Sequence, residues 1–174
     1  MVHTNKGDSL ISMFLLSWLL LPLQAAGQDF DNIEIITNHV KDNIYYLEGS
    51  GGNIGVIVGN DGVLIVDNQF APLSNKIEAA ITDLSELPVT FAVNSHFHYD
   101  HTDGNENFGK AGAFIVAQEN ARRRMESTQV LATGRAQERY DEVGLPKITF
   151  TDTMRFYFND EPIDLIHTGP GHTD

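Results

Sequence analysis

The sequence predicts a layered α/β domain, and three observations carry this prediction. Between residues 33 and 66, short β-rich runs alternate with turn signals. Residues 73–84 instead carry apolar side chains at helical spacing. Residues 89–93 and 113–117 are short, continuous apolar runs, as expected of strands buried on both faces of a sheet. Because no internal repeat or domain linker is visible, a single domain is expected.

The first elements are four strands in succession, at residues 33–37, 44–47, 54–58 and 63–66. The turn signal Asn60-Asp61-Gly62 stands before the fourth run, so these strands are predicted to form a β-meander. Helical spacing then begins after Pro72, a residue favoured at the start of a helix. One face of this helix, over residues 73–84, should pack on the sheet.

Later elements are less regular. A second, surface helix is predicted at residues 119–126, where three consecutive arginines (Arg122, Arg123 and Arg124) are expected to form a solvated face. Residues 127–147 are polar and weakly periodic, so they are assigned as loop with at most one helical turn. Apolar and polar residues then alternate over 154–158, the Asn159-Asp160 pair turns the chain, and residues 163–166 return as a strand.

The N-terminus has the pattern of a secretory signal peptide. Lys6 precedes an apolar run over residues 11–21, and Ala25 and Gly27 supply small residues before Gln28. A membrane anchor is the alternative, but the run is shorter than the roughly 20 residues that cross a bilayer. We therefore expect residues 1–27 to be removed, and residues 28–174 to be periplasmic or secreted without stable membrane association.

Charge and cysteine content narrow the possible functions. The net charge is −13, and it stays −13 without residues 1–27 because these contain one basic and one acidic residue. An acidic surface repels phosphate backbones, so no nucleic-acid partner is expected. There is no cysteine, so any metal must be held by nitrogen and oxygen ligands.

A cluster of metal-ligand residues follows the apolar run 89–93. His96 and His98 are two residues apart, which in extended backbone points both imidazoles the same way, toward one metal ion. Asp100 and His101 come next, and a turn there would aim them at a second metal, as in two-metal hydrolytic sites. The cluster stands after a buried strand, where α/β sheets place their sites.

Chance does not explain this cluster well. Three histidines and one aspartate at these offsets should arise in roughly one shuffled chain in a thousand at this composition. A third nitrogen ligand is also available, since His172 lies in a glycine-flanked loop that allows close approach of the backbone to a metal. His96, His98, Asp100, His101 and His172 are therefore the predicted metal ligands, with zinc as the expected metal.

The pattern His-x-His-x-Asp-His followed by Gly-x-Gly-His-Thr resembles the metallo-β-lactamase superfamily. The resemblance implies an αββα sandwich of which this chain holds only the N-terminal part. It also implies that His96, His98 and His172 hold a first zinc, while Asp100 and His101 are two ligands of a second. Asp67, at the end of the run 63–67, resembles the family's aspartate beneath the metals, and Gly51-Gly52-Asn53 resembles its flexible hairpin near the substrate.

Within this superfamily the residues favour zinc hydrolysis. His98 stands where the oxygen-reducing diiron members carry a glutamate, and His101 is present where the cysteine-dependent lactamases lack it. Zinc lowers the pKa of a bound water toward 7, which supplies a metal-bound hydroxide as nucleophile at neutral pH. Asp100 is the predicted catalytic residue, placed to handle a proton.

The sequence departs from the family pattern where it ends, at Asp174. Family members continue beyond this motif, so the resemblance implies that the domain of residues 28–174 is incomplete at its C-terminus and lacks further ligands of the second metal. His167 and His39 are more often structural histidines than ligands, and His3 lies in the expected signal peptide.

These observations predict an exported zinc-dependent hydrolase that binds one or two Zn²⁺ per chain and acts on a small-molecule ester, lactone, lactam or thioester. The sequence does not separate these substrates, because substrate choice lies in loop geometry. The alternative is a non-catalytic periplasmic zinc-binding accessory module, or an inactive fragment.

Overall fold

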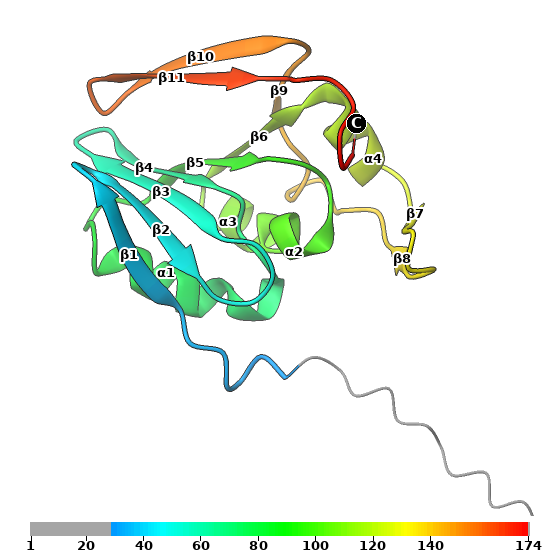
Figure 1. The fold of residues 1–174 in the computed structure, drawn as a ribbon, viewed down its shortest axis with the longest axis horizontal. Coiled ribbons are helices and arrows are strands. Elements are labelled where there is room, and N and C mark those ends of the chain that lie inside the picture. Colours follow the sequence, from blue (N-terminus) through cyan, green and yellow to red (C-terminus); the bar gives the residue numbers. More distant parts are fainter. Residues whose placement is uncertain (1–28, 174) are drawn as a thin grey trace, which may run out of the picture.

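A seven-stranded sheet lies at the centre of the protein, and its first four strands form the predicted β-meander (Figure 1). The computed structural model describes residues 29–173. In sheet order the strands are β1 (Ile36–Lys41), β2 (Ile44–Glu48), β3 (Ile54–Gly59), β4 (Gly62–Val66), β5 (Val89–Asn94), β6 (Phe114–Gln118) and β9 (Ile148–Phe150). Strands β1 to β4 pair antiparallel, whereas β4, β5, β6 and β9 pair parallel. The carboxyl ends of the parallel strands therefore meet at one edge, where a site is expected.

Most of the helices lie on one face of this sheet, and the last one lies beyond the end of β6, beside the C-terminal segment (Figure 1). They are a short 3-10 helix η1 (Ala71–Leu73), α1 (Ser74–Thr82), α2 (Tyr99–Thr102), α3 (Asn105–Lys110) and α4 (Glu119–Met125). Pro72 lies in the first turn of η1, as its position before the helical run predicted. Leu73, Ile77 and Ile81 are buried together with residues of the sheet, so the predicted packing face is confirmed.

The opposite face of the sheet carries a second, two-stranded sheet, β10 (Thr153–Phe158) and β11 (Glu161–Ile166) (Figure 1). The alternation along β10 is confirmed, because Phe156 and Phe158 point inward and contact Phe91 of β5, with ring centroids 4.9 and 5.4 Å apart. Asn159 and Asp160 both have positive φ, 56° and 63°, as the turn between twisted strands requires. The predicted α/β layering is thus confirmed, with one helical layer and two layers of strands.

Two regions differ from their predictions. The first strand begins at Ile36, not residue 33, because Ile33 and Ile35 pack into the core while Lys76 of α1 binds the carbonyl oxygens of Phe30, Asp31 and Ile33. Residues 127–147, assigned as loop with at most one helical turn, instead include two short paired strands, β7 (Gln129–Val130) and β8 (Ala136–Gln137).

The expected solvated arginine face on α4 is only partly correct. Arg123 is exposed and pairs with Glu119 one turn away. Arg122 instead donates to the carbonyl oxygen of Pro146, and Arg124 lies over the ring of Phe97.

Membrane association can be examined only for the described part of the chain. None of its helices is long and apolar enough to cross a membrane. The predicted signal peptide, residues 1–27, lies outside the described residues.

Candidate metal centre

The histidine motif lies at the carboxyl end of β5, where it connects to α2. β5 ends at Asn94 and α2 begins at Tyr99, so His96 and His98 lie in the connection between them, which bends at residues 95–97 and is extended at His98. Phe97 between them is only 5% exposed and packs into a small core against α4. The imidazoles of His96 and His98 remain partly exposed and lie beside each other, with ring centroids 4.9 Å apart.

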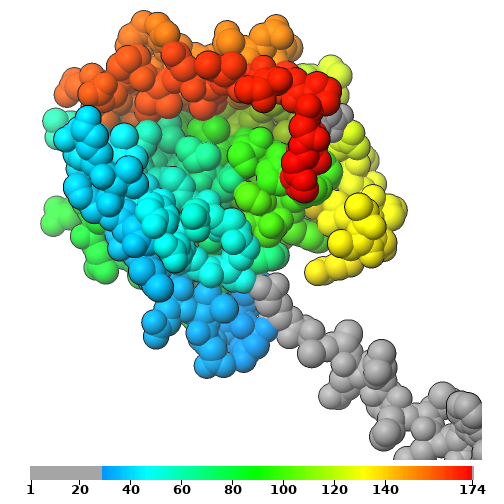
Figure 2. All heavy atoms as spheres, viewed as in Figure 1, coloured from blue at the N-terminus to red at the C-terminus, as the bar shows by residue number. Residues whose placement is uncertain are grey.

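His172 joins these two histidines from the far end of the chain. After β11, the C-terminal segment returns to the motif and lies against it (Figure 2). His98 Nδ1 and His172 Nε2 are 3.1 Å apart, and each of His96, His98 and His172 offers a ring nitrogen within 4.8 Å of the others. The structure thus brings together the three residues predicted for the first metal, and no other group of three donors forms within residues 29–173.

Electrostatics favour the neutral, metal-binding form of two of these imidazoles. Burial, followed by the nearby His101 and His98, lowers the pKa of His96 to about 4. Burial and the neighbouring His172 also lower the pKa of His98. A histidine binds a metal through an unprotonated nitrogen, so His96 and His98 are available as ligands at neutral pH.

Asp100 and His101 form a second pair of donors beside the three histidines. His101 Nε2 lies 3.4 Å from a carboxylate oxygen of Asp100, and the rings of His101 and His96 have centroids 4.1 Å apart. The first turn of α2 carries both residues, which explains why adjacent residues of the motif converge here. These two atoms alone make an incomplete ligand set, and among the described residues no third donor accompanies them.

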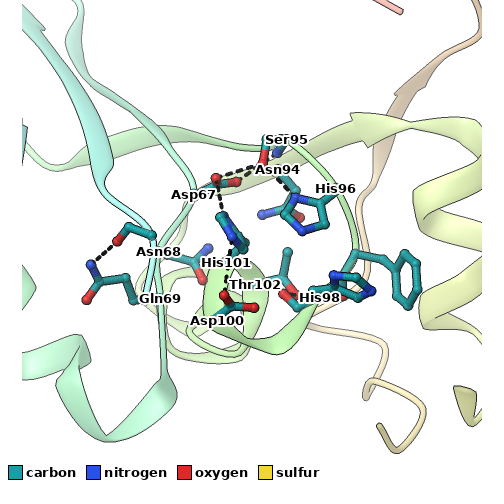
Figure 3. Close-up of polar contacts among 12 residues, drawn as sticks. Asp67, Asn68, Gln69, Asn94, Ser95, His96, His98, Asp100, His101 and Thr102 are labelled. Atoms are coloured by element: carbon teal, nitrogen blue, oxygen red, sulfur yellow. Dashed lines mark hydrogen bonds and ion pairs between the residues drawn. The ribbon is translucent and has the colours of Figure 1, made fainter. Parts of the chain in front are cut away.

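Asp67 contacts His101 of this pair and connects it to Ser95, directly after β5 (Figure 3). Its buried carboxylate accepts from the Ser95 backbone N–H and from Ser95 Oγ, each at 2.7 Å, and contacts His101 Nδ1 at 2.7 Å. This contact with Asp67 raises the pKa of His101. With Nδ1 bound to Asp67, His101 presents Nε2 to the site, which is how a carboxylate orients a ligand histidine.

Ser95 was not singled out from the sequence. Its hydroxyl lies 2.7 Å from Asp67 and 3.0 Å from His96 Nδ1, so it connects the aspartate to a ligand of the other set. Only its place between a strand end and the first histidine of the motif could have indicated this role.

A loop of residues 49–53, here called the glycine loop, lies directly against the second pair of donors. A Cβ atom on Gly52 would lie 2.5 Å from His101 Cε1, and one on Gly51 would lie 2.9 Å from Asp100 Cβ. Gln69 holds this loop from below, since its side chain accepts from the Ser50 backbone N–H at 3.1 Å and donates to the Gly52 carbonyl oxygen (Figure 3). The hairpin inferred by resemblance therefore lies beside Asp100 and His101.

A cavity of about 520 Å³ opens between the edge of the main sheet and β11. His96 and His172 line it, together with apolar side chains such as Val93, Phe150 and Leu165 and with polar ones that include Gln118 and Asp164. His167 also borders this cavity, although it is absent from the group of three histidines. His39 lies elsewhere, on β1, where its ring is tilted against that of Tyr45.

The residues present fit a zinc ion. Two nitrogen ligands 2.0 to 2.1 Å from a tetrahedral zinc lie about 3.3 Å apart. His98 Nδ1 and His172 Nε2, at 3.1 Å, are already close to that separation, and nitrogen is a donor that zinc prefers. His96, His98 and His172 could therefore hold zinc with one coordination position left for a water molecule or substrate.

Comparison with known proteins shows which family and fold the chain shares. The model of the metallo-beta-lactamase superfamily matches residues 47–174. Among solved structures, the Rm3 metallo-beta-lactamase is 26% identical with a TM-score of 0.61, covering 79% of this chain and 52% of that one. BJP-1, a subclass B3 metallo-beta-lactamase of Bradyrhizobium japonicum, is 24% identical with a TM-score of 0.62, covering 79% and 53%. A class B3 di-zinc enzyme, LRA-12 from an Alaskan soil metagenome, is 21% identical with a TM-score of 0.67 and the same coverage.

These similarities confirm the predicted family and its α/β fold. The chain spans about half the length of the solved structures that it matches.

Proposed function

Since the chain belongs to the metallo-beta-lactamase superfamily, we propose that it carries the first metal site of an exported zinc-dependent hydrolase. The observation that carries this proposal is the convergence of His96, His98 and His172 on one point. Asp100 and His101 would hold a second zinc beside it, with Asp67 orienting His101.

Each group around the site has a distinct task in hydrolysis. A bound zinc ion supplies Lewis acidity, which lowers the pKa of a coordinated water toward neutrality. Ser95 and Asp67 hold the imidazoles of His96 and His101 in place, so that the ligand set is preorganised. Asp100, whose side chain is partly exposed at the site, would accept a proton from the attacking water and pass it to the leaving group.

The substrate class follows from charge and from the shape of the cavity. The net charge of −13 disfavours phosphodiesters and other polyanions. The cavity beside His96 and His172 has both apolar and polar walls, which suits a neutral or cationic small molecule with an apolar part. The solved relatives named above are described as metallo-beta-lactamases, so a β-lactam stands beside an ester, lactone and thioester as candidate substrate.

A substrate panel tests the proposal. The zinc-loaded protein should hydrolyse at least one of four probes: a cephalosporin, an aryl ester, a γ-lactone and an acyl thioester. His98→Ala should abolish this activity, because it removes one of three zinc ligands. His39→Ala is the matched control and should retain it, since His39 lies on β1 against Tyr45.

Metal stoichiometry decides between catalysis and simple binding. Hydrolysis by protein that contains zinc supports the proposal. One bound zinc with no hydrolysis of any probe would instead favour the non-catalytic binding module. Export has its own test, because the mature protein should be recovered from the periplasm or medium with its N-terminus near Gln28.

A further inference from the structure

The backbone between the two histidines of the motif is fixed by buried polar groups. Phe97 anchors this stretch through its ring, which packs against Ala121, Met125 and Tyr140. Its carbonyl oxygen accepts hydrogen bonds from Thr102 Oγ1 at 3.1 Å and from Gln137 Nε2 at 2.5 Å. The main chain and the side chain of Phe97 are therefore both held, which fixes the backbone that carries His96 and His98 on either side.

The Thr102 hydroxyl lies between the Tyr140 hydroxyl and two carbonyl oxygens of the motif. Thr102 Oγ1 lies 2.9 Å from the carbonyl oxygen of His98 as well as 3.1 Å from that of Phe97, and 2.7 Å from the Tyr140 hydroxyl. A threonine hydroxyl has a single proton, and the two carbonyl oxygens can only accept. When Tyr140 donates to Thr102 Oγ1, the Thr102 proton is left for the backbone of the motif.

Both supporting residues come from residues 127–147, which the sequence did not resolve into elements. Gln137 belongs to β8 and Tyr140 follows it, and both are buried. Burial raises the pKa of the Tyr140 phenol, so its hydroxyl remains protonated and able to donate. Gln137 bonds to the backbone of Phe97 directly, and Tyr140 contacts it through Thr102.

The buried side chain of Gln137 bonds to the Phe97 carbonyl oxygen but leaves its own amide oxygen unpaired, which is unfavourable for stability. It is 1% exposed, and its Oε1 is one of two buried side-chain atoms without a hydrogen-bond partner among the described residues. Burying an unpaired polar atom is unfavourable, and an apolar side chain of similar size would avoid it. An amide at this position is explained by what its N–H groups hold, which is the carbonyl oxygen of Phe97.

We propose that Tyr140 and Gln137 are positioning residues for the metal site, which hold the backbone of Phe97 and His98 so that the two flanking imidazoles reach one metal ion. This inference rests on the proposed zinc site and adds to it a support from a different part of the chain. It assigns residues 127–147 a role in metal affinity in addition to their packing against α4.

The test is the zinc affinity of Tyr140→Phe, which keeps the buried ring and removes only the hydroxyl. We expect the zinc dissociation constant to rise about 10-fold, the lower end of the effect of groups that support metal ligands. The visible spectrum of the Co²⁺-substituted protein should change as well, because it reports ligand geometry. Tyr45→Phe, on β2 against His39, is the matched control and should bind zinc as wild type does.

A double-variant cycle separates positioning from general loss of stability. Thr102→Val removes the other hydroxyl of the pair at constant shape and provides the test even where Tyr140→Phe does not fold. If both hydroxyls act through one chain of hydrogen bonds, the double variant should bind zinc no more weakly than Thr102→Val alone. Additive losses of affinity would overturn the inference.

The remaining outcomes are also distinct. Zinc affinity and a Co²⁺ spectrum that are the same in Tyr140→Phe and wild type would overturn this inference alone. Absence of zinc binding by the wild-type protein would overturn the proposed function together with it.

Discussion

Replacing Asp67 with asparagine tests the support beneath the metal centre in the absence of metal. The carboxylate of Asp67 is 7% exposed and accepts two hydrogen bonds from Ser95 and one from His101, each at 2.7 Å. Asparagine has the same shape and tolerates the positive φ of 65° at this position. The substitution therefore changes the hydrogen bonds at this position without straining the backbone.

The expected loss follows from these three contacts. A hydrogen bond to a charged group contributes about 1.5 to 3 kcal/mol, compared with about 1 kcal/mol for a neutral pair. The single oxygen of asparagine can accept from the Ser95 N–H, but its amide N–H groups face His101. Loss of the His101 bond costs about 2 kcal/mol and weakening of the Ser95 bonds about 1 kcal/mol, so the free energy of unfolding should fall by about 3 kcal/mol.

Urea denaturation of the metal-free protein at neutral pH measures this change. With an m-value of about 2 kcal/mol/M for a domain of this size, the midpoint should fall by about 1.5 M at unchanged slope. Asp42→Asn is the matched control, because Asp42 also has positive φ, 49°, but lies exposed on the β1–β2 turn. The control should stay within about 0.5 kcal/mol of wild type. An equally small effect of Asp67→Asn would refute the assigned role of its carboxylate.

Three further outcomes are expected. The difference in free energy of unfolding between metal-free wild type and Asp67→Asn should narrow as the pH rises from about 6 to about 9. Because folding raises the pKa of His101, its protonated form stabilises the folded protein at low pH, and this stabilisation is lost as His101 deprotonates. A constant difference would contradict this. Asn159→Ala should lower the free energy of unfolding, measured by urea denaturation, by about 2 kcal/mol. The Asn159 side chain accepts from the backbone N–H of Asp61 and donates to the Gly62 carbonyl oxygen, and so joins the two turns. Unchanged stability would show that these hydrogen bonds do not stabilise the fold. Gln69→Leu should speed amide hydrogen exchange in the glycine loop without unfolding the sheet. The reason is that leucine cannot form hydrogen bonds with the backbone of Ser50 and Gly52. Equal exchange rates would show that Gln69 does not hold the loop.

Regular periodicity made much of the fold predictable from sequence. The meander of β1 to β4, the helix carrying Ile77 and Ile81, and the alternation along β10 each follow one period over several residues. Tertiary contacts set the remaining boundaries. Ile33 and Ile35 have the composition of a strand, yet they pack without pairing while Lys76 binds nearby carbonyl oxygens.

The predicted ligands of the candidate site form a short local motif and one later histidine, so the sequence could identify them. Their supports could not be identified in the same way. Nothing in the local sequence distinguishes Ser95, because its contact with Asp67 forms only when β4 and β5 pair in the sheet. Tyr140 and Gln137 lie about 40 residues beyond the motif, in a stretch of short strands without a period, so nothing local indicates their contacts with Thr102 and Phe97.

Zinc content of the purified protein is the most direct test of the central claim, that His96, His98 and His172 form a metal site. Wild type, His96→Ala and His39→Ala should be compared by metal analysis under non-denaturing conditions. We expect at least one equivalent of zinc in wild type and in His39→Ala, and its loss in His96→Ala. Wild-type protein without zinc, or His96→Ala with as much zinc as wild type, would contradict the account.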